Sequence, residues 1–340
     1  MPTFTYPTNA ILMEIAQDFL PQLMLNDPIF SYMPIVMQPA ELVIWEQEDS
    51  SKGLQGVRGI DGQPNRVKPL GGKRFSMEPG SYGDVSIVGA TELTRLRNYG
   101  TFGDTISLDK IIARRQRQLL DRQIKRLCQI GWTLFATGTF SNFNKYGQVA
   151  HTDTYSMQSY TAGVPWSTVA TAAPLQNFRE VLLLARGHSV VFDSSATAYM
   201  NQVTFQSFSR NINAADIYGT RTAGLATVIG INDINNVLLL NGLPKIAVYD
   251  KGYLNDNNVF VPYIPNNTVI VFGNREDGES IAQYQMTPCA EREDLGPGQY
   301  SRVTDSINSN NGVPREIQVH LGHNGGPALL FPSAVVRMTV

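Results

Sequence analysis

The sequence lacks most features that would point to an enzyme, a secreted protein or a membrane protein. Its 340 residues include only two cysteines, Cys128 and Cys289, which form no Cys-x-x-Cys pair. Neither a disulfide framework nor a zinc site is therefore expected. No segment approaches the roughly 20 continuous apolar residues of a membrane span, and no secretory signal is visible. We expect reduced thiols in a protein made in the cytoplasm, without membrane contact.

Recognisable catalytic motifs are also missing. The segment 71–74 resembles the end of a phosphate-binding loop, but Val67 stands where the first glycine belongs and Arg74 where the Ser or Thr belongs. His320 and His323 form a His-x-x-His pair, yet residues three apart on a strand point to opposite faces. No catalytic, metal-binding or cofactor-binding residue is assigned. A Ser/His/Asp triad assembled across space stays open as an alternative.

What is present is the composition of a globular protein with appendages. The apolar fraction is 42% and the formal net charge is −2. The length exceeds that of one usual domain, which favours two folded units. Helical and strand patterns both occur, so an α+β fold is expected.

The first hundred residues look like arms. Residues 8–35 contain an amphipathic stretch interrupted by prolines, which predicts a short helix in an extended arm. Residues 42–49 predict a strand, and strand character returns near 84–97. Between Gly53 and Gly103 lie 11 of the 29 glycines. The range 42–97 is therefore predicted to be a two-stranded arm that needs support from a neighbouring molecule. Its basic, glycine-rich tip carries Lys52, Arg58, Arg66, Lys68, Lys73 and Arg74.

Residues 107–135 give the strongest helix signal. Ser107 is a suitable N-cap, and the apolar residues lie within about 100° of one another on a helical wheel. They are Leu108, Ile112, Leu119, Leu127, Ile130 and Leu134. A helix of this length is expected to act as a spine.

The remainder alternates between strands and helices. Short strands are expected within 139–161, and a second unit is expected to start near Trp166. Its predicted helices are Pro174–Arg186 and 195–208. Its predicted strands are Ser189–Phe192, 226–231, 237–240, 245–250 and 268–273. Residues 287–315 are predicted to form a long loop, followed by strands at 315–321 and 328–340, the last beside the long helix.

One face of the long helix is strongly basic. It carries seven cations against a single carboxylate, that of Asp121. The cations are Lys110, Arg114, Arg115, Arg117, Arg122, Lys125 and Arg126. This face could bind nucleic acid through phosphates, or an acidic assembly partner. It could equally be a solvated face or one paired with acidic loops of a neighbour. No aromatic residue interleaves with the cations, so base stacking is not expected.

Four segments, in order along the chain, carry a family resemblance. They are the Trp-then-helix segment 166–179, the strand 245–250 with Gly252-Tyr253, the segment 260–273, and the ending Pro-Ser-Ala-Val-Val at 332–336. Together they resemble the lambda-type major head protein (protein E) family of tailed bacteriophages, which has the Hong Kong 97-type capsid fold.

That resemblance implies five parts: an N-terminal arm at 1–40, an extended β-hairpin loop at 41–100, a peripheral domain at 101–165 with its spine helix 107–135, a mixed α/β axial domain at 166–322, and C-terminal strands at 323–340 that return to the peripheral domain. It implies a shell of hexamers and pentamers around double-stranded DNA, in a virion assembled in the host cytoplasm. Expected partners are a separate scaffolding protein, a portal, packaged DNA bound without sequence specificity, and, as a further candidate, a decoration protein.

Two alternatives remain open at this point. One is an encapsulin-like compartment shell with the same fold and a cargo enzyme, which a cargo peptide on the inner face would favour. The other is a soluble hydrolase with an unrecognised triad, which a monomer that turns over a generic ester would favour.

Overall fold

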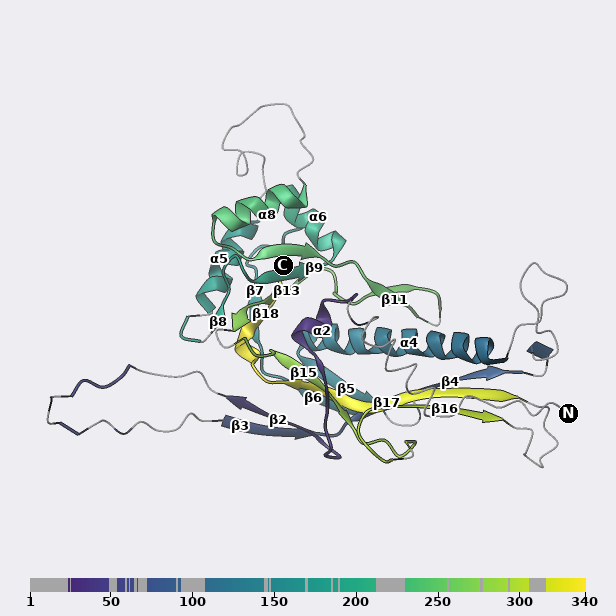
Figure 1. Ribbon diagram of the computed structural model, residues 1–340. Coiled ribbons are helices and arrows are strands. Elements are labelled where there is room, and N and C mark those ends of the chain that lie inside the picture. The colour runs from purple at the N-terminus through teal and green to yellow at the C-terminus, as the bar shows by residue number, and fades with distance from the viewer. Residues whose placement is uncertain are drawn as a thin grey trace.

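The computed structural model shows two five-stranded β-sheets with one long helix lying between them (Figure 1). It describes the residues 24, 26–48, 54–58, 60, 62–63, 66, 72–89, 91–92, 108–143, 146, 148–168, 171–184, 186–188, 190–211, 230–255, 257–275, 278–292, 294–305 and 316–340. The predicted helix near the N-terminus and the predicted strand at 226–231 fall almost entirely outside these residues. The mixture of helices and strands confirms the α+β class.

The long helix α4, Leu108–Thr137, confirms the predicted spine. Its 30 residues span about 45 Å at 1.5 Å per residue. All six apolar residues predicted to share a face are buried. The helix ends at Gly138, whose φ of 74° is the left-handed conformation that favours glycine, and the Gly138 N–H donates to the carbonyl of Leu134.

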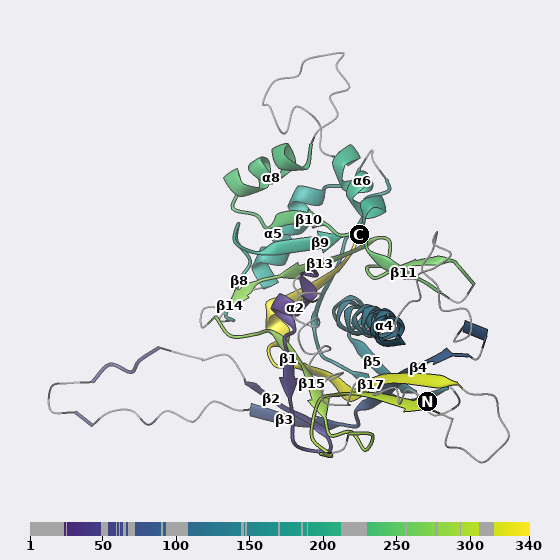
Figure 2. The ribbon, with the colours of Figure 1, turned by 45° about the vertical axis from the view of Figure 1, so that its right-hand side comes forward.

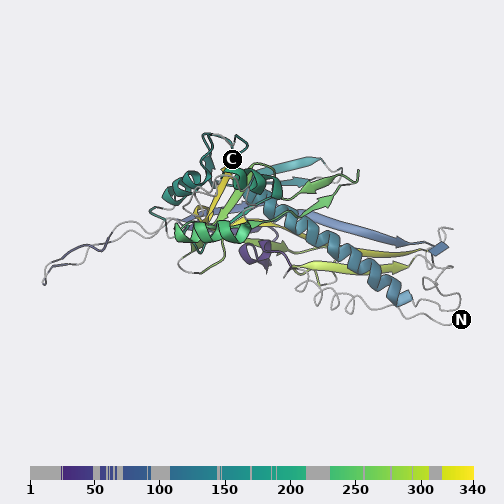
Figure 3. The ribbon, with the colours of Figure 1, turned by 90° about the horizontal axis from the view of Figure 1, so that it is seen from above.

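One sheet lies beneath α4 and is organised around the 13-residue strand β17, Ile317–Leu329. On one side β17 pairs with β4, Gly80–Val88. On the other side it pairs with β16, Gln299–Asp305, and then with β15, Ala282–Thr287. The short strand β1, Ile35–Met37, extends the sheet in parallel with β15. Seen from above, α4 runs roughly along these strands (Figure 3).

Two predictions for this region were wrong. The loop predicted at 287–315 contains β16, and β17 does not stop at 321 but continues through Gly325 and Gly326. These glycines belong to the strand because neighbouring strands approach closely there. A Cβ atom on Gly325 would lie 2.5 Å from the carbonyl oxygen of Gln285. The close approach of the neighbouring strand thus explains the glycine at position 325.

The predicted arm is present, but its second strand is a different one. Strand β2, Val43–Glu48, was predicted, and it pairs antiparallel with β3, Gly72–Met77. The strand signal expected near 84–97 is instead β4, which pairs with β17. Strand β3 is inconspicuous in sequence because few of its residues are apolar: Phe75 stacks on Trp45, and Met77 enters the core. The hairpin base is therefore 43–48 with 72–77.

The second sheet has the order β10-β9-β13-β18-β7. These strands are Lys245–Val248, Thr197–Met200, Thr268–Phe272, Val335–Thr339 and Gln158–Thr161. Three helices pack with this sheet, and two of them, α6 and α8, lie on its side away from α4 (Figure 2). The helices are α5, Pro174–Leu184, α6, Gln202–Asn211, and α8, Ile231–Leu240.

Several sequence predictions change in this unit. Residues 197–200, predicted to be helical, form β9, because all four side chains are buried in the sheet. Residues 237–240, predicted as a strand, end α8. The final strand β18 pairs with β13 and β7, so it belongs to the second sheet and not to the sheet beneath the helix. The predicted boundary at 322/323 falls inside β17, and the division into domains stays a prediction.

The remaining elements are short. The helix α2, Ile29–Tyr32, packs on α4. The strands expected within 139–161 are confirmed by β7 and by the hairpin of β5, Thr139–Phe143, with β6, Val149–Thr154. A second hairpin, β11 with β12, joins Gly252–Leu254 to Phe260–Pro262 and was not predicted. The strand predicted at Ser189–Phe192 is β8, Val190–Val191, which pairs with β14, Asn274–Arg275; the 3-10 helix η2 is Pro332–Ala334.

Candidate assembly surfaces on the long helix and the extended hairpin

The basic face of α4 is partly neutralised by carboxylates of the same chain. Arg115 pairs with Glu92 at 2.8 Å, and Arg122 pairs with Asp84 on β4 at 2.6 Å. Lys125 pairs with Asp121 one turn earlier at 2.6 Å. The sequence predicted the basic face, but it did not predict that β4 supplies a counter-charge. In the N-terminal half of the helix, Lys110, Arg114 and Arg117 are exposed.

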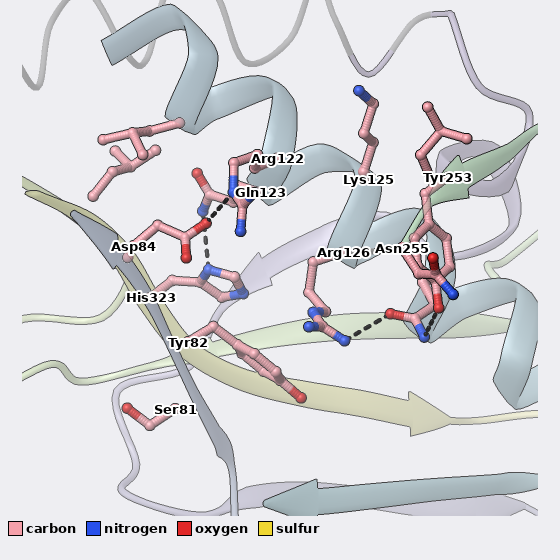
Figure 4. Close-up of a pocket in the computed structure, with 16 residues that line it drawn as sticks. Ser81, Tyr82, Asp84, Arg122, Gln123, Lys125, Arg126, Tyr253, Asn255 and His323 are labelled. Atoms are coloured by element: carbon pink, nitrogen blue, oxygen red, sulfur yellow. Dashed lines mark hydrogen bonds and ion pairs between the residues drawn. The ribbon is translucent and has the colours of Figure 1, made fainter. Parts of the chain in front are cut away.

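A cleft of about 550 Å³ opens beside the middle of α4, along residues 119–129. Figure 4 shows side chains from four parts of the fold converging there: α4, the strands β4 and β17, and the hairpin of β11. Its basic residues are Arg122, Lys125 and Arg126, and Asp84 is the only carboxylate among the residues that line it. The lining therefore carries a net positive charge.

The cations of the cleft are held in place by neighbouring groups. The guanidinium of Arg126 lies 5.9 Å from the ring centre of Tyr82 and donates to Gln129 Oε1 at 2.7 Å. The amide of Gln129 in turn donates to the hydroxyl of Tyr253 at 3.4 Å. Burial raises the pKa of Tyr82 to about 12, although Arg126 acts in the opposite direction. Tyr82 therefore stays neutral and supplies an aromatic floor.

A buried histidine lies beneath the cleft. Gln123 Nε2 is 3.0 Å from Nδ1 of His323, and Tyr284 Oη is 3.1 Å from its Nε2. Because the amide of Gln123 donates to Nδ1, the neutral ring donates its own proton from Nε2 to Tyr284. Burial lowers the pKa of His323 to about 4. The ring of Tyr82 stacks on it with centres 5.3 Å apart.

The His-x-x-His pair does not form a joint site. His323 faces α4, whereas His320 lies on the other face of β17 beside Thr304 at 3.3 Å. This confirms the prediction from strand geometry. Within the described ranges, no group of three His, Cys, Asp or Glu residues comes together in a way that could hold a metal ion. Both cysteines are free and buried, and burial raises their pKa values, for Cys289 to about 12.

The extended hairpin presents apolar side chains to solvent. Leu54, Val57 and Ile60 are 99%, 98% and 100% exposed. Only the basic and glycine residues of this tip were predicted from sequence, and its exposed apolar residues were missed. A signal was available, since the three recur at intervals of three residues in a segment without other large apolar side chains.

The basic residues predicted for the hairpin are spread over it. Lys73 and Arg74 lie on β3, opposite Gln47 and Glu46 of β2. Arg58 and Arg66 are exposed, and Arg58 donates to the carbonyl of Gly62 at 3.2 Å. Lys52 and Lys68 lie outside the described residues.

Many solved structures share this fold, and two of them are similar over nearly their whole length. The first is assigned as the capsid protein of a prophage in Escherichia coli CFT073; it matches with a TM-score of 0.65 at 10% identity, over 99% of this chain and 100% of its own. The second is a phage-related protein from Bordetella bronchiseptica RB50, with a TM-score of 0.53 at 10% identity, over 98% of both chains. The arrangement of long helix, hairpin and two sheets is the Hong Kong 97-type capsid fold, as the sequence resemblance implied.

The family follows from the sequence itself. The model of the phage major capsid protein E family matches residues 8–287, and the chain belongs to this family. No curated protein matches the chain. Among the described residues, no helix is both long and apolar enough to cross a membrane. The family and the fold together identify the chain as a bacteriophage capsid protein with a structural role.

Proposed function

We propose that this chain is the major building block of an icosahedral phage head, assembling into hexamers and pentamers around double-stranded DNA. Assembly takes place in the host cytoplasm and requires no catalytic activity of the subunit. Its family and its fold support this role. A closed shell needs several different interfaces on one chain, and a body with projecting arms supplies them.

The observation that carries the proposal is the exposed apolar tip of the hairpin. Three aliphatic side chains that are almost completely solvated are unfavourable on an isolated subunit. Burying each of them against a neighbour contributes roughly 1.5–3 kcal/mol. An isolated two-stranded hairpin is also marginal in water. The hairpin therefore acts as an intersubunit arm that becomes stable in the assembled shell.

The basic residues have a different role in this proposal. Lys110, Arg114 and Arg117, on the exposed N-terminal half of α4, contact packaged DNA through phosphates and without sequence specificity. A separate scaffolding protein and a portal complete the head, and a decoration protein is a further candidate partner. The membrane has no part in this assembly.

Expression of the chain with and without its neighbouring phage genes, followed by electron microscopy, tests the proposal. Shells, rings or tubes are the expected result. Subunits that stay monomeric under all these conditions and hydrolyse a generic ester would contradict it.

A tip variant sharpens the test. Replacing Leu54, Val57 and Ile60 with serine should leave subunit stability within about 0.5 kcal/mol per site, since the side chains are exposed in the subunit. Shell formation should nevertheless be lost. Gln55→Ala is the matched control, because it truncates an exposed side chain of the same segment without removing apolar surface. Normal shells from the serine variant would show that the tip is not an anchor.

A further inference from the structure

The cleft beside α4 combines chemical groups in a way that the exposed N-terminal half of the helix does not. Its lining offers three cations, a carboxylate, amide groups of Gln129 and Asn255, and the apolar side chain of Leu254. Clefts of several hundred Å³ are typical of sites that enclose a ligand. A ligand that fits this cleft would interact with all of these groups.

We infer that this cleft binds an acidic, extended polypeptide segment of another assembly protein through paired carboxylates. Arg122 and Arg126 are one turn apart on α4, which places their Cβ atoms about 5–6 Å from each other. Alternate residues of an extended chain lie about 6.6–6.8 Å apart on one side. A Glu-x-Glu segment therefore brings one carboxylate to each guanidinium.

The groups around the cations suit a peptide better than a nucleic acid. The carboxylate of Asp84 accepts hydrogen bonds, and a peptide backbone has N–H groups to donate, whereas a phosphate backbone has none. Leu254 is 65% exposed on the wall of the cleft and can pack against an aliphatic side chain. Both features would be unfavourable or unused in a phosphate site.

The shape of the cleft also distinguishes between the two ligands. The cleft is walled by β4 on one side and by the β11 hairpin on the other (Figure 4). A rigid duplex would touch the rim, while an extended polypeptide can enter.

Binding is favoured because side chains that would contact the ligand are already held in place in the subunit. Arg126 is fixed by Tyr82 and Gln129, and Gln129 is fixed by Tyr253. Little side-chain ordering is left to be done when the ligand enters. Charge-assisted hydrogen bonds from a guanidinium to a carboxylate are stronger than hydrogen bonds between neutral groups.

The test measures peptide binding to the purified full-length subunit by fluorescence anisotropy. The probe is a labelled Leu-Glu-Ala-Glu-Leu peptide, compared with its Leu-Lys-Ala-Lys-Leu counterpart and with a short duplex DNA. The acidic peptide should bind, and the lysine peptide should not. Duplex DNA should fail to displace the acidic peptide; displacement that depends on Lys125 and Arg126 would assign the cleft to nucleic acid and overturn the inference.

Two double variants locate the site. Lys125→Gln with Arg126→Gln should weaken the acidic peptide at least tenfold. The matched control, Lys110→Gln with Arg114→Gln, removes the same charge from the same helix outside the cleft and should change the affinity less than twofold, because salt screens such distances. An equal loss of affinity in both double variants would mean that the peptide is attracted only by the overall charge of the helix, and it would overturn the inference.

A further variant leaves Arg126 unchanged, so a folding defect caused by replacing Arg126 cannot explain its result. Leu254→Asp adds a negative charge to the exposed wall without removing any cation, and it should also weaken the acidic peptide. Unchanged binding in this variant would count against the cleft. The inference rests on the proposed shell role only for the origin of the acidic segment. Peptide binding is measured on subunits, so its failure and a failure to form shells are separate results.

Discussion

The two halves of α4 belong to different surroundings although they form one continuous helix. Residues 108–120 pack in a small apolar cluster with Val88 and the far end of β17. Residues 124–136 lie in the main core, where Trp132 and Phe135 meet Phe272 of the second sheet. Between them lies the polar contact of Gln123, His323 and Tyr284.

The two halves of α4 therefore contribute differently to the stability of the subunit. The C-terminal half is enclosed by both sheets and by α2, so it is the fixed base of the molecule. The N-terminal half packs in the smaller cluster, and Lys110, Arg114 and Arg117 are exposed there. The cleft lies at the junction, where the helix is already rigid but still has an open side.

The largest expected effect is in the main core. Trp132→Ala removes a fully buried indole that lies 4.6 Å, centre to centre, from the ring of Tyr249. It should lower the free energy of unfolding of the subunit by about 4 kcal/mol. Urea denaturation followed by circular dichroism measures this, and a loss under 1 kcal/mol would contradict the assignment of this half as the base.

The smaller cluster should respond more locally. Ile112→Ala, at a fully buried site, should cost about 3 kcal/mol. Amide hydrogen exchange should speed up in residues 108–120 while residues 124–136 stay protected. Equally faster exchange along the whole helix would show that the two halves open as one unit, and it would contradict the distinction between them.

The polar contact between the halves should make stability depend on pH. His323 has its pKa lowered from 6.5 to about 4 by burial. In the folded state it stays neutral, while the unfolded state binds a proton below pH 6.5, so stability falls as pH falls from about 6.5 to about 4. Between pH 7 and pH 5 the loss from this group is about 2 kcal/mol.

The His323→Gln variant isolates this contribution. Other titrating groups remain in both proteins, so the difference between the two stability–pH curves belongs to His323. The variant curve should be flatter by about 2 kcal/mol over the same interval. Parallel curves would mean that the buried histidine does not carry this pH dependence.

The smallest effect on stability is expected on the exposed basic face. Replacing Lys110, Arg114 and Arg117 with glutamine should change the free energy of unfolding by no more than about 0.5 kcal/mol per site. DNA retained in shells should nevertheless fall, and the slope of log affinity against log salt should decrease by up to about 2.7. Lys125→Gln is the single-site control from the cleft, and an equal loss of DNA there would remove the distinction between the two halves.

The long helix was the element best predicted from sequence, because its apolar residues recur with the helical period over many turns. Strands β2, β10 and β13 were also predicted, since each is a short run rich in β-branched or aromatic residues. The arm was predicted from weak apolar content, but its return strand was assigned to β4. Local composition could not distinguish the two candidates, because strand pairing depends on the whole sheet.

The cleft could not be predicted from sequence either, because contacts between distant parts of the chain form it. Tyr82, Arg126, Tyr253 and His323 come from four separate parts of the sequence, and no local pattern relates them. Only the basic residues were identified, through their density on one helix.

The sequence by itself determined the helix, its basic face, the first strand of the hairpin, and the family. These features depend on periodicity, charge and composition, which are properties of neighbouring residues. The tertiary structure decided that β4 joins β17, that β18 completes the second sheet, and that Asp84 opposes Arg122. Those outcomes depend on contacts between distant residues, whose free energies appear only when the chain is packed.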